Sequence, residues 1–229
     1  MIVGAALRGR PQHTIGARWG GHGVPPLQSL YEVKMVEEIV DCLENGGVVL
    51  LPTDTVYGLA VSPKFDKSID RLFALKRRPR TVNLPIMVAS DDELEHLGFE
   101  ISESARRLLR SPLIPGSITL ALGFSSDYRP QWLNGRDEAA IRIPNDEQLL
   151  AVLRKAGPLL VTSANAHSAD TPDNVADILA QLDGAPDLWV DGGRLKTTAS
   201  TLVNCRVDPP VIERLGVVPE SEVLRYLNE

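Results

Sequence analysis

Residues 50–59 read LLPTDTVYGL, in which the end of an apolar run is followed by a short polar segment. The apolar run, residues 48–51, predicts a buried strand. A proline ends this strand, and Thr53, Asp54 and Thr55 follow it. Open α/β sheets bind ligands at such strand ends, although Thr and Asp side chains in loops more commonly satisfy local backbone groups. Two later segments with complementary chemistry favour a ligand site.

A second strand end carries small polar residues. Residues 159–165 read LLVTSAN, so a predicted buried strand leads into Ser163 and Asn165, which stand two positions apart and face the same way. A hydroxyl and an amide at this place can cap the following turn, and they can equally hold phosphate oxygens and a ribose. The chain has no G-x-S-x-G nucleophile elbow, so we interpret Ser163 as a binding residue rather than a nucleophile.

A basic run, KRRPR, occupies residues 76–80 at the end of a predicted helix. Such a run is commonly a solvated helix end that the helix dipole favours. Pro79, however, moves Arg78 out of the helical region. If the backbone is extended from Lys76 onward, Lys76 and Arg78 project to one side and Arg77 to the other. A lysine and an arginine on one face suit a polyphosphate.

Arg142 lies within the alternating apolar segment AAIRIP, residues 139–144. A cation on an interior strand is unfavourable unless it meets an anion. Two partners are open: an acidic residue of the protein, or the carboxylate of a substrate. The chain contains neither a P-loop nor a G-x-G-x-x-G motif, so a nucleotide would occupy an uncommon kind of site.

The hydrophobic pattern predicts one α/β domain over residues 31–229, built on a twisted, mixed sheet with flanking helices. Asp66 and Asn145 are the expected caps of two helices, and Ser90 with Glu93 forms a capping box. Helices are expected to begin near residues 31, 66, 90, 102, 145, 172 and 219. Strands are expected at residues 48–51, 85–89, 117–124, 138–143, 159–162, 188–190, 200–204 and 211–213.

Residues 1–30 differ from the rest of the chain. They are rich in glycine and proline and show no hydrophobic period, so we expect a mobile or loosely docked arm. Residues 1–31 hold three arginines and no acid, so the chain's net charge of −6 leaves −9 on the remainder. This acidity argues against an autonomous nucleic-acid-binding domain.

The 229 residues are 43% hydrophobic, and no apolar run is long enough to span a bilayer. The two cysteines, Cys42 and Cys205, stand in unrelated segments without metal-ligand spacing. We expect reduced thiols, a cytoplasmic protein and no membrane partner. The four histidines are scattered, so we expect no metal site built from the protein's own side chains.

Six motifs together resemble the YrdC-like threonylcarbamoyl-AMP synthase family. Each motif alone is weak, but their shared order over about residues 35–215 is specific. Because the chain ends soon after the last motif, it is similar to the short form of the family, with a single YrdC-like domain. The motifs are PTDTVYG at 52–58, K-x-R-P at 76–79, PGSIT at 115–119, AIRIP at 140–144, SAN at 163–165 and STLV at 200–203.

The resemblance implies that ATP, bicarbonate or CO₂, and L-threonine react to give threonylcarbamoyl-AMP and pyrophosphate. A separate transferase complex would then pass the threonylcarbamoyl group to an adenosine of tRNA. Mg²⁺ is expected to accompany ATP, held mostly by phosphates and water. The resemblance also implies that direct binding of tRNA, if it occurs, is weak.

The resemblance assigns roles to ten residues. Four of the six ATP-binding residues also form the catalytic set, and Arg142 would hold the carboxylate of threonine. The catalytic residues are Lys76, Arg78, Ser163 and Asn165, and Thr171 and Arg214 complete the ATP set. The residues implied around L-threonine are Thr55, Arg142, Val161 and Ser200.

Two positions depart from the family pattern: Asp54 stands where many members have Glu, and Ala89 where many have His. Two alternatives to the synthase are kept. One is an RNA-binding module of the same fold. The other is a carbamoyl-adenylate-forming relative, although the additional zinc-finger-like and acylphosphatase-like regions of such proteins are not visible in this sequence.

Overall fold

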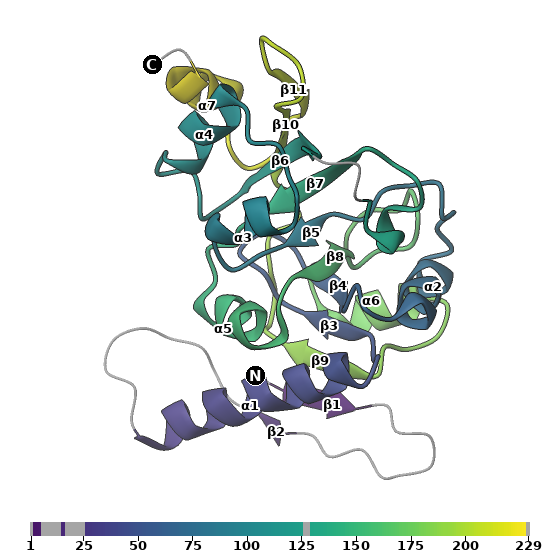
Figure 1. The fold of residues 1–229 in the computed structure, drawn as a ribbon. Helices are drawn as coiled ribbons and strands as arrows, with labels where there is room; N and C mark the ends of the chain where they lie inside the picture. Colours follow the sequence, from purple (N-terminus) through teal and green to yellow (C-terminus); the bar gives the residue numbers. More distant parts are fainter. Residues whose placement is uncertain (1, 6–14, 17–25, 126–128, 228–229) are drawn as a thin grey trace.

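One mixed sheet connects all the strands of the computed structural model, which describes residues 2–5, 15–16, 26–125 and 129–227 (Figure 1). Within these residues the order of its eleven strands is β11-β10-β6-β7-β5-β8-β4-β3-β9-β1-β2. The strands are β1 (Ile2–Ala5), β2 (Ile15–Gly16), β3 (Val49–Leu51), β4 (Gly58–Val61), β5 (Ile86–Met87), β6 (Ile118–Gly123), β7 (Glu138–Arg142), β8 (Leu159–Ser163), β9 (Leu188–Asp191), β10 (Thr201–Asn204) and β11 (Val211–Arg214).

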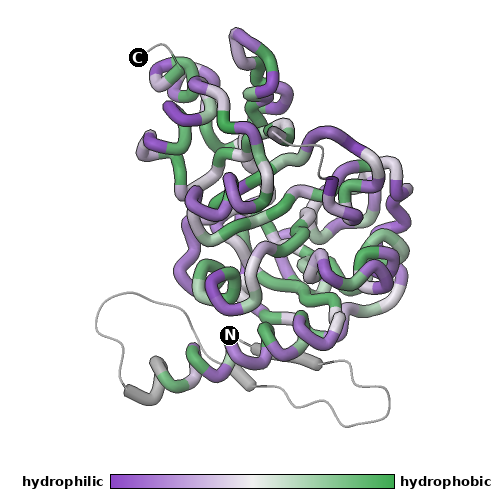
Figure 2. Tube along the Cα trace, in the orientation of Figure 1, coloured by the Kyte–Doolittle hydropathy of each residue, from purple (hydrophilic) through white to green (hydrophobic). Residues whose placement is uncertain are grey.

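Helices pack along this sheet, with α1 against α5 near β3 and β9, and α4 against α7 near β10 (Figure 1). The central strands are hydrophobic along their length, whereas the helices alternate hydrophobic and hydrophilic faces (Figure 2). The helices are α1 (Pro26–Glu44), α2 (Asp66–Leu75), α3 (Asp92–His96), α4 (Glu103–Leu109), α5 (Glu147–Ala156), α6 (Val175–Gln181) and α7 (Glu220–Leu227). A short 3-10 helix covers Gln131–Leu133.

The strand pairing brings the motifs together. Strands β3 and β4 form an antiparallel hairpin whose connection is residues 52–57, and β4 pairs with β8 so that Gly58 faces Ser163. Strand β5 lies between β8 and β7, and its Met87 pairs with Arg142. A Cβ on Gly58 would come within 2.8 Å of Val161 Cγ1, so this close strand contact requires glycine.

The predicted fold class, one α/β domain on a mixed sheet with flanking helices, is confirmed. Strand β4 was not predicted. The polar residues that precede it give no sign that the chain turns back and pairs with β3. Two helix caps were also predicted wrongly. The helix expected to be capped by Asn145 is capped by Asp146, which accepts from Leu149 N at 2.8 Å. Helix α2 begins at Asp66 itself, and its N-cap residue is Phe65.

The other helix starts agree more closely with the sequence. Ser102 caps α4 by accepting a hydrogen bond from Ala105 N, as expected. Before α3, the Glu93 carboxylate accepts from the backbone N–H of Ser90 at 3.3 Å and from that of Ala89 at 2.8 Å. This is the Glu93 half of the predicted capping box, whereas the N-cap residue of α3 is Asp91 and not Ser90.

The N-terminal region contains regular structure that its composition does not indicate. Strand β1 pairs antiparallel with β9, Val3 lying opposite Val190, and also with β2. Helix α1 begins at Pro26, so the domain boundary predicted after residue 30 falls inside a helix. Most of the predicted mobile or loosely docked arm lies outside the described residues, so it stays a prediction. Within the described ranges, none of the helices combines the length and the hydropathy needed to cross a bilayer.

Candidate functional site

A cavity of about 510 Å³ lies over the middle of the sheet, with lining residues from β4 to β8 and from β11. It collects seven of the ten residues implied by the family motifs, although these stand up to 159 positions apart. Those seven are Thr55, Arg78, Arg142, Val161, Ser163, Ser200 and Arg214. Three predicted residues do not line the cavity: Lys76, Asn165 and Thr171.

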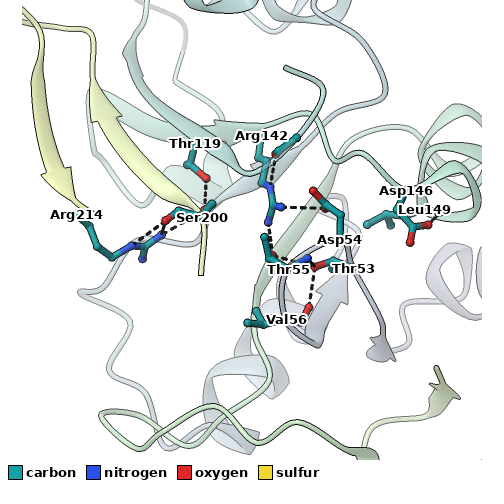
Figure 3. Close-up of polar contacts among 11 residues, drawn as sticks. Thr53, Asp54, Thr55, Val56, Thr119, Arg142, Asp146, Leu149, Ser200 and Arg214 are labelled. Atoms are coloured by element: carbon teal, nitrogen blue, oxygen red, sulfur yellow. Dashed lines mark hydrogen bonds and ion pairs between the residues drawn. The ribbon is translucent and has the colours of Figure 1, made fainter. Parts of the chain in front are cut away.

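The Arg142 side chain is the buried centre of this cavity, with 5% of its surface exposed. Its Nε donates to the carbonyl of Gly116 at 3.0 Å, and its Nη1 donates to Thr55 Oγ1 at 2.8 Å. Its Nη2 lies 2.9 Å from Asp54 Oδ1, and the Asp54 side chain is 12% exposed (Figure 3). The guanidinium is therefore held on three sides by the protein.

The contact with Asp54 is an ion pair without hydrogen-bond alignment. Although Arg142 Nη2 and Asp54 Oδ1 are in contact, both are buried atoms without a well-directed hydrogen-bond partner. Burial lowers the pKa of Arg142, and the Asp54 charge opposes that shift. Of the two partners left open by the sequence, the acidic residue is present. Nη2 is therefore a buried donor beside Asp54 whose hydrogen-bonding capacity is not used.

The connection before β4 is held by its own hydroxyls. Thr53 Oγ1 donates to the carbonyl of Val56 at 2.7 Å and accepts from the backbone N–H of Thr55 at 3.1 Å. Thr53 therefore serves the local backbone, as polar loop residues commonly do. This turn aims the Thr55 hydroxyl at Arg142, so the same segment both stabilises a loop and shapes the cavity.

On the side of the cavity away from Asp54, Ser200 lies just before β10 and contacts residues of β6 and β11 (Figure 3). Its hydroxyl lies 2.7 Å from Thr119 Oγ1 on β6, and its carbonyl accepts from Arg214 Nη2 on β11 at 2.9 Å (Figure 3). Burial lowers the pKa of Arg214. A Cβ on Gly216 would come within 2.2 Å of the Ala199 carbonyl oxygen, so a glycine is required where this wall folds back.

Arg78 brings a third guanidinium to the cavity. Its Nη2 donates to the carbonyl of Asn83 at 2.6 Å, and its buried Nε has no hydrogen-bond partner. Burial is the main cause that lowers the pKa of Arg78, followed by the charge of Arg136. Among the residues that line the cavity, three are arginines and none is an acid. This lining favours an anionic ligand.

The extended backbone predicted from Lys76 onward is wrong. Lys76 keeps helical angles (φ −87°, ψ −6°), and Arg77 is left-handed, with φ 49°. Arg77 does point away from the cavity and lies 3.4 Å from Asp183 on the surface, but the turn, not a strand, separates it from Arg78. Lys76 itself is buried, and its ammonium contacts residues 163–165.

Comparison with known proteins decides the family. The Sua5, YciO and YrdC family model, described as "Telomere recombination", matches residues 41–216. The chain belongs to this family. The threonylcarbamoyl-AMP synthase of Pyrococcus abyssi is 31% identical over 189 residues, which are 82% of this chain and 55% of that protein. The synthase of Bacillus subtilis is 32% identical over 184 residues, 79% of this chain and 53% of that protein.

Solved structures of the Sua5/YciO/YrdC family share the fold. The crystal structure of P. abyssi Sua5 complexed with L-threonine superposes with a TM-score of 0.78 at 30% identity, covering 86% of this chain and 58% of that one. Escherichia coli YciO superposes with a TM-score of 0.72 at 24% identity, covering 81% and 91%. This chain spans little more than half the length of the two synthases described above.

The set of site residues predicted from the sequence lacks several polar residues of the site, among them Asp54, Thr119 and Asn83. Thr119 belongs to the PGSIT motif, and a hydroxyl residue within the apolar run ITLAL is a signal that could have found it. Asp54 stood in the starting segment, but nothing in the sequence pairs it with a residue 88 positions away. Asn83 contributes its backbone carbonyl, which carries no sequence signal.

Asp146, the cap of α5, lies beyond Asp54 as seen from Arg142 (Figure 3). Burial raises the pKa of Asp146, and the Asp54 charge adds to this, while hydrogen bonds from backbone N–H groups oppose it. Folding raises the pKa of Asp146 above its ordinary value of 3.8. The side chain therefore contributes its full stabilisation only at pH values below 3.8, and this contribution is lost as the pH rises through the pKa of the folded protein.

We therefore expect Asp146→Asn to raise the melting temperature at pH 7. Asparagine retains the cap without the buried charge, so the gain should disappear near pH 3, where the wild-type carboxyl is protonated in both states. Thermal unfolding of both proteins at the two pH values measures the difference. An equal effect at both pH values would show that ionisation of Asp146 plays no part.

Proposed function

We propose that this chain is an L-threonylcarbamoyl-adenylate synthase, which forms threonylcarbamoyl-AMP and pyrophosphate from L-threonine, bicarbonate or CO₂, and ATP. The observation that carries the proposal is the buried Arg142, which faces a cavity lined by two further arginines and no acid. The proposed substrates bring one carboxylate and one triphosphate to this site. Similarity to proteins named threonylcarbamoyl-AMP synthase supports the same activity.

The threonine half of the site would centre on Arg142. Arg142 lines the cavity, so its guanidinium is the group that would receive the substrate carboxylate. The Thr55 and Ser200 hydroxyls would contact the substrate's polar side, and Val161 would border the same subsite from β8. The P. abyssi protein whose solved structure contains L-threonine is one of the similar structures, which supports this assignment.

The ATP half would centre on Arg78, with Ser163 and Arg214 as further lining residues of the same cavity. In the proposed reaction the threonine nitrogen first bonds to the carbon of CO₂ and loses a proton. A carbamate oxygen then bonds to the α-phosphorus, and the bond to the leaving pyrophosphate breaks. The arginines would stabilise the charge on the phosphates, so catalysis would consist mainly of positioning and electrostatics.

We also propose that Mg²⁺ enters with the triphosphate as part of the substrate. The cavity lining offers guanidinium, hydroxyl and backbone groups but no carboxylate. Mg²⁺ prefers oxygen ligands and commonly keeps several waters. This lining therefore fits an ion held by phosphates and water, with the arginines neutralising the remaining phosphate charge.

A mixed anhydride of a carbamate and AMP is an activated acyl group, which suits transfer to an acceptor. We propose, from the family resemblance, that a separate transferase complex makes this transfer to tRNA. Direct binding of tRNA and a cytoplasmic location stay predictions.

The test mixes the protein with Mg-ATP, bicarbonate and single amino acids, and measures pyrophosphate release. Release should require threonine. Salt-dependent RNA binding without pyrophosphate release would instead favour the RNA-binding alternative. Release that requires carbamoyl phosphate in place of threonine would favour the carbamoyl-adenylate-forming relative.

The amino-acid panel should also rank serine and valine. Serine lacks only a methyl group, so we expect its kcat/KM to fall about 10- to 10²-fold, the limit for one methylene in a pocket. Valine matches the shape of threonine but lacks its hydroxyl, so buried polar partners would be left unpaired and the loss should be larger. Kinetics with each amino acid measure the ranking. If valine were the better substrate, the hydroxyls of Thr55 and Ser200 would not contact the side chain.

A further inference from the structure

Lys76 contacts the turn at residues 163–165 from inside the protein. Its side chain is among the most buried in the chain, with 1% exposed, and it does not line the cavity. Its Nζ donates to the carbonyls of Ser163 and of Asn165, the latter at 2.5 Å, and to Asn165 Oδ1 at 3.2 Å. The five other lysines of the chain, all described, are exposed.

These contacts use the whole hydrogen-bonding capacity of the ammonium. A lysine ammonium has three N–H groups and no acceptor, and three protein oxygens already receive them. Arg78 differs, because it lines the cavity and its five N–H groups have two protein acceptors, Thr162 Oγ1 and the Asn83 carbonyl. Of the two cations, the arginine therefore has donors left for a ligand.

The turn is fixed to the end of α2 by further bonds. The backbone N–H of His167 donates to the carbonyl of Lys76 at 2.8 Å. The Asn165 Nδ2 donates to the carbonyls of Ala166 and Ala169, at 3.1 and 2.7 Å, which leaves its Oδ1 facing Lys76. Ser163 Oγ donates to the same Oδ1 at 2.6 Å. Lys76 therefore sets the position of Ser163, which does line the cavity.

This network also defines what Ser163 can offer a ligand. Its hydroxyl has one proton, which goes to Asn165, so lone pairs remain on the cavity side. An anionic phosphate oxygen accepts hydrogen bonds and gives none. Ser163 therefore suits an O–H or N–H group of a substrate, such as a ribose hydroxyl or an amine, better than a phosphate oxygen.

We propose that Lys76 is a positioning residue that holds the turn at 163–165 and does not contact the phosphates of the substrate. This assignment rests on the proposed function, because it concerns the same cavity. Desolvation and the Arg78 charge lower the pKa of Lys76 to about 7, while the three oxygen acceptors favour its charged form. An ammonium in this place would be held by its acceptors rather than by an acidic partner.

Lysine ammonium NMR on the wild-type protein tests the assignment directly. Exposed ammonium groups exchange rapidly with water, whereas a buried, fully bonded one should give a protected ¹H–¹⁵N signal without any ligand. Lys76→Met identifies that signal by removing it, and Lys76→Arg serves if the first variant does not fold. Adding inorganic tripolyphosphate should shift the guanidinium N–H signals of Arg78 and leave the lysine signal nearly unchanged. A lysine signal that appears only with tripolyphosphate would overturn the proposal.

The same titration separates this inference from the proposed function. If tripolyphosphate moves no arginine signal, the proposed ATP site is wrong, while the signal in the free protein still decides whether Lys76 holds the turn. Kinetics add a second readout. We expect Lys76→Met to lower kcat by ~10-fold or more while the KM for ATP stays within about threefold of the wild-type value. Ser163→Ala should lower kcat less in the Lys76→Met protein than it does in the wild-type protein. A raised KM for ATP with unchanged kcat would indicate direct phosphate contact.

Discussion

Arg142→Lys should raise the KM for threonine by about 10²-fold while the affinity for ATP changes little. Lysine keeps the charge but replaces the planar fork with one nitrogen. That nitrogen cannot meet Gly116, Thr55 and Asp54 together, as the arginine does. The expected factor corresponds to losing about 2–3 kcal/mol of charge-assisted hydrogen bonding. Steady-state kinetics in each substrate and calorimetric titration of ATP measure the two effects.

Removing the charge altogether should also affect folding. Arg142→Met would leave Asp54 mostly buried without its partner, and breaking a buried pair in this way destabilises proteins by about 3–5 kcal/mol. The double variant Arg142→Met/Asp54→Asn should recover most of that stability without recovering the use of threonine. Denaturant unfolding and pyrophosphate release separate the structural role of the arginine from binding.

Two results would contradict this assignment. If Arg142→Lys abolished ATP binding while threonine affinity stayed intact, the two halves of the site would be reversed. If the double variant used threonine normally, Arg142 would be a structural cation alone, paired with Asp54.

The sequence predicted much of this site because its elements have local signals. Runs of apolar residues that end in threonine, serine or asparagine located β3 and β8, and an arginine among apolar residues located β7. The partner of Arg142 could not be predicted in this way. Asp54 reaches it through the β4–β8–β5–β7 pairing, and tertiary geometry of this kind has no periodicity in the sequence.

Local backbone geometry explains why the predicted direction of the Lys76 side chain was wrong. The rule for a residue before proline acts on Arg78 and says nothing about Arg77, whose left-handed conformation reverses the chain one residue earlier. With that turn, the lysine enters the protein while Arg78 reaches the cavity. A left-handed arginine is uncommon, so sequence reasoning gives it little weight.

Arg78→Ala should lower the rate of pyrophosphate formation by about 10²-fold or more, the scale of losing one donor to transition-state charge. Arg78 lines the cavity and its guanidinium has more N–H groups than protein acceptors, so it can meet developing charge on the phosphates. Arg77 is the matched control. It is the preceding residue with the same chemistry, but its side chain is 67% exposed and near Asp183. Arg77→Ala should change the rate by no more than about twofold, because exposed pairs contribute little.

Single-turnover measurements with saturating threonine would compare the two variants, with melting temperatures to show that each is folded. Loss of Arg78 also frees the Asn83 carbonyl, so some destabilisation is expected, and only a rate effect measured on folded protein counts. If the two variants lost rate equally, net positive charge near the cavity would matter and the direction of the side chain would not. If Arg77→Ala lowered the rate of pyrophosphate formation and Arg78→Ala did not, the phosphates would lie on the Asp183 side of the turn, outside the cavity that contains Arg142.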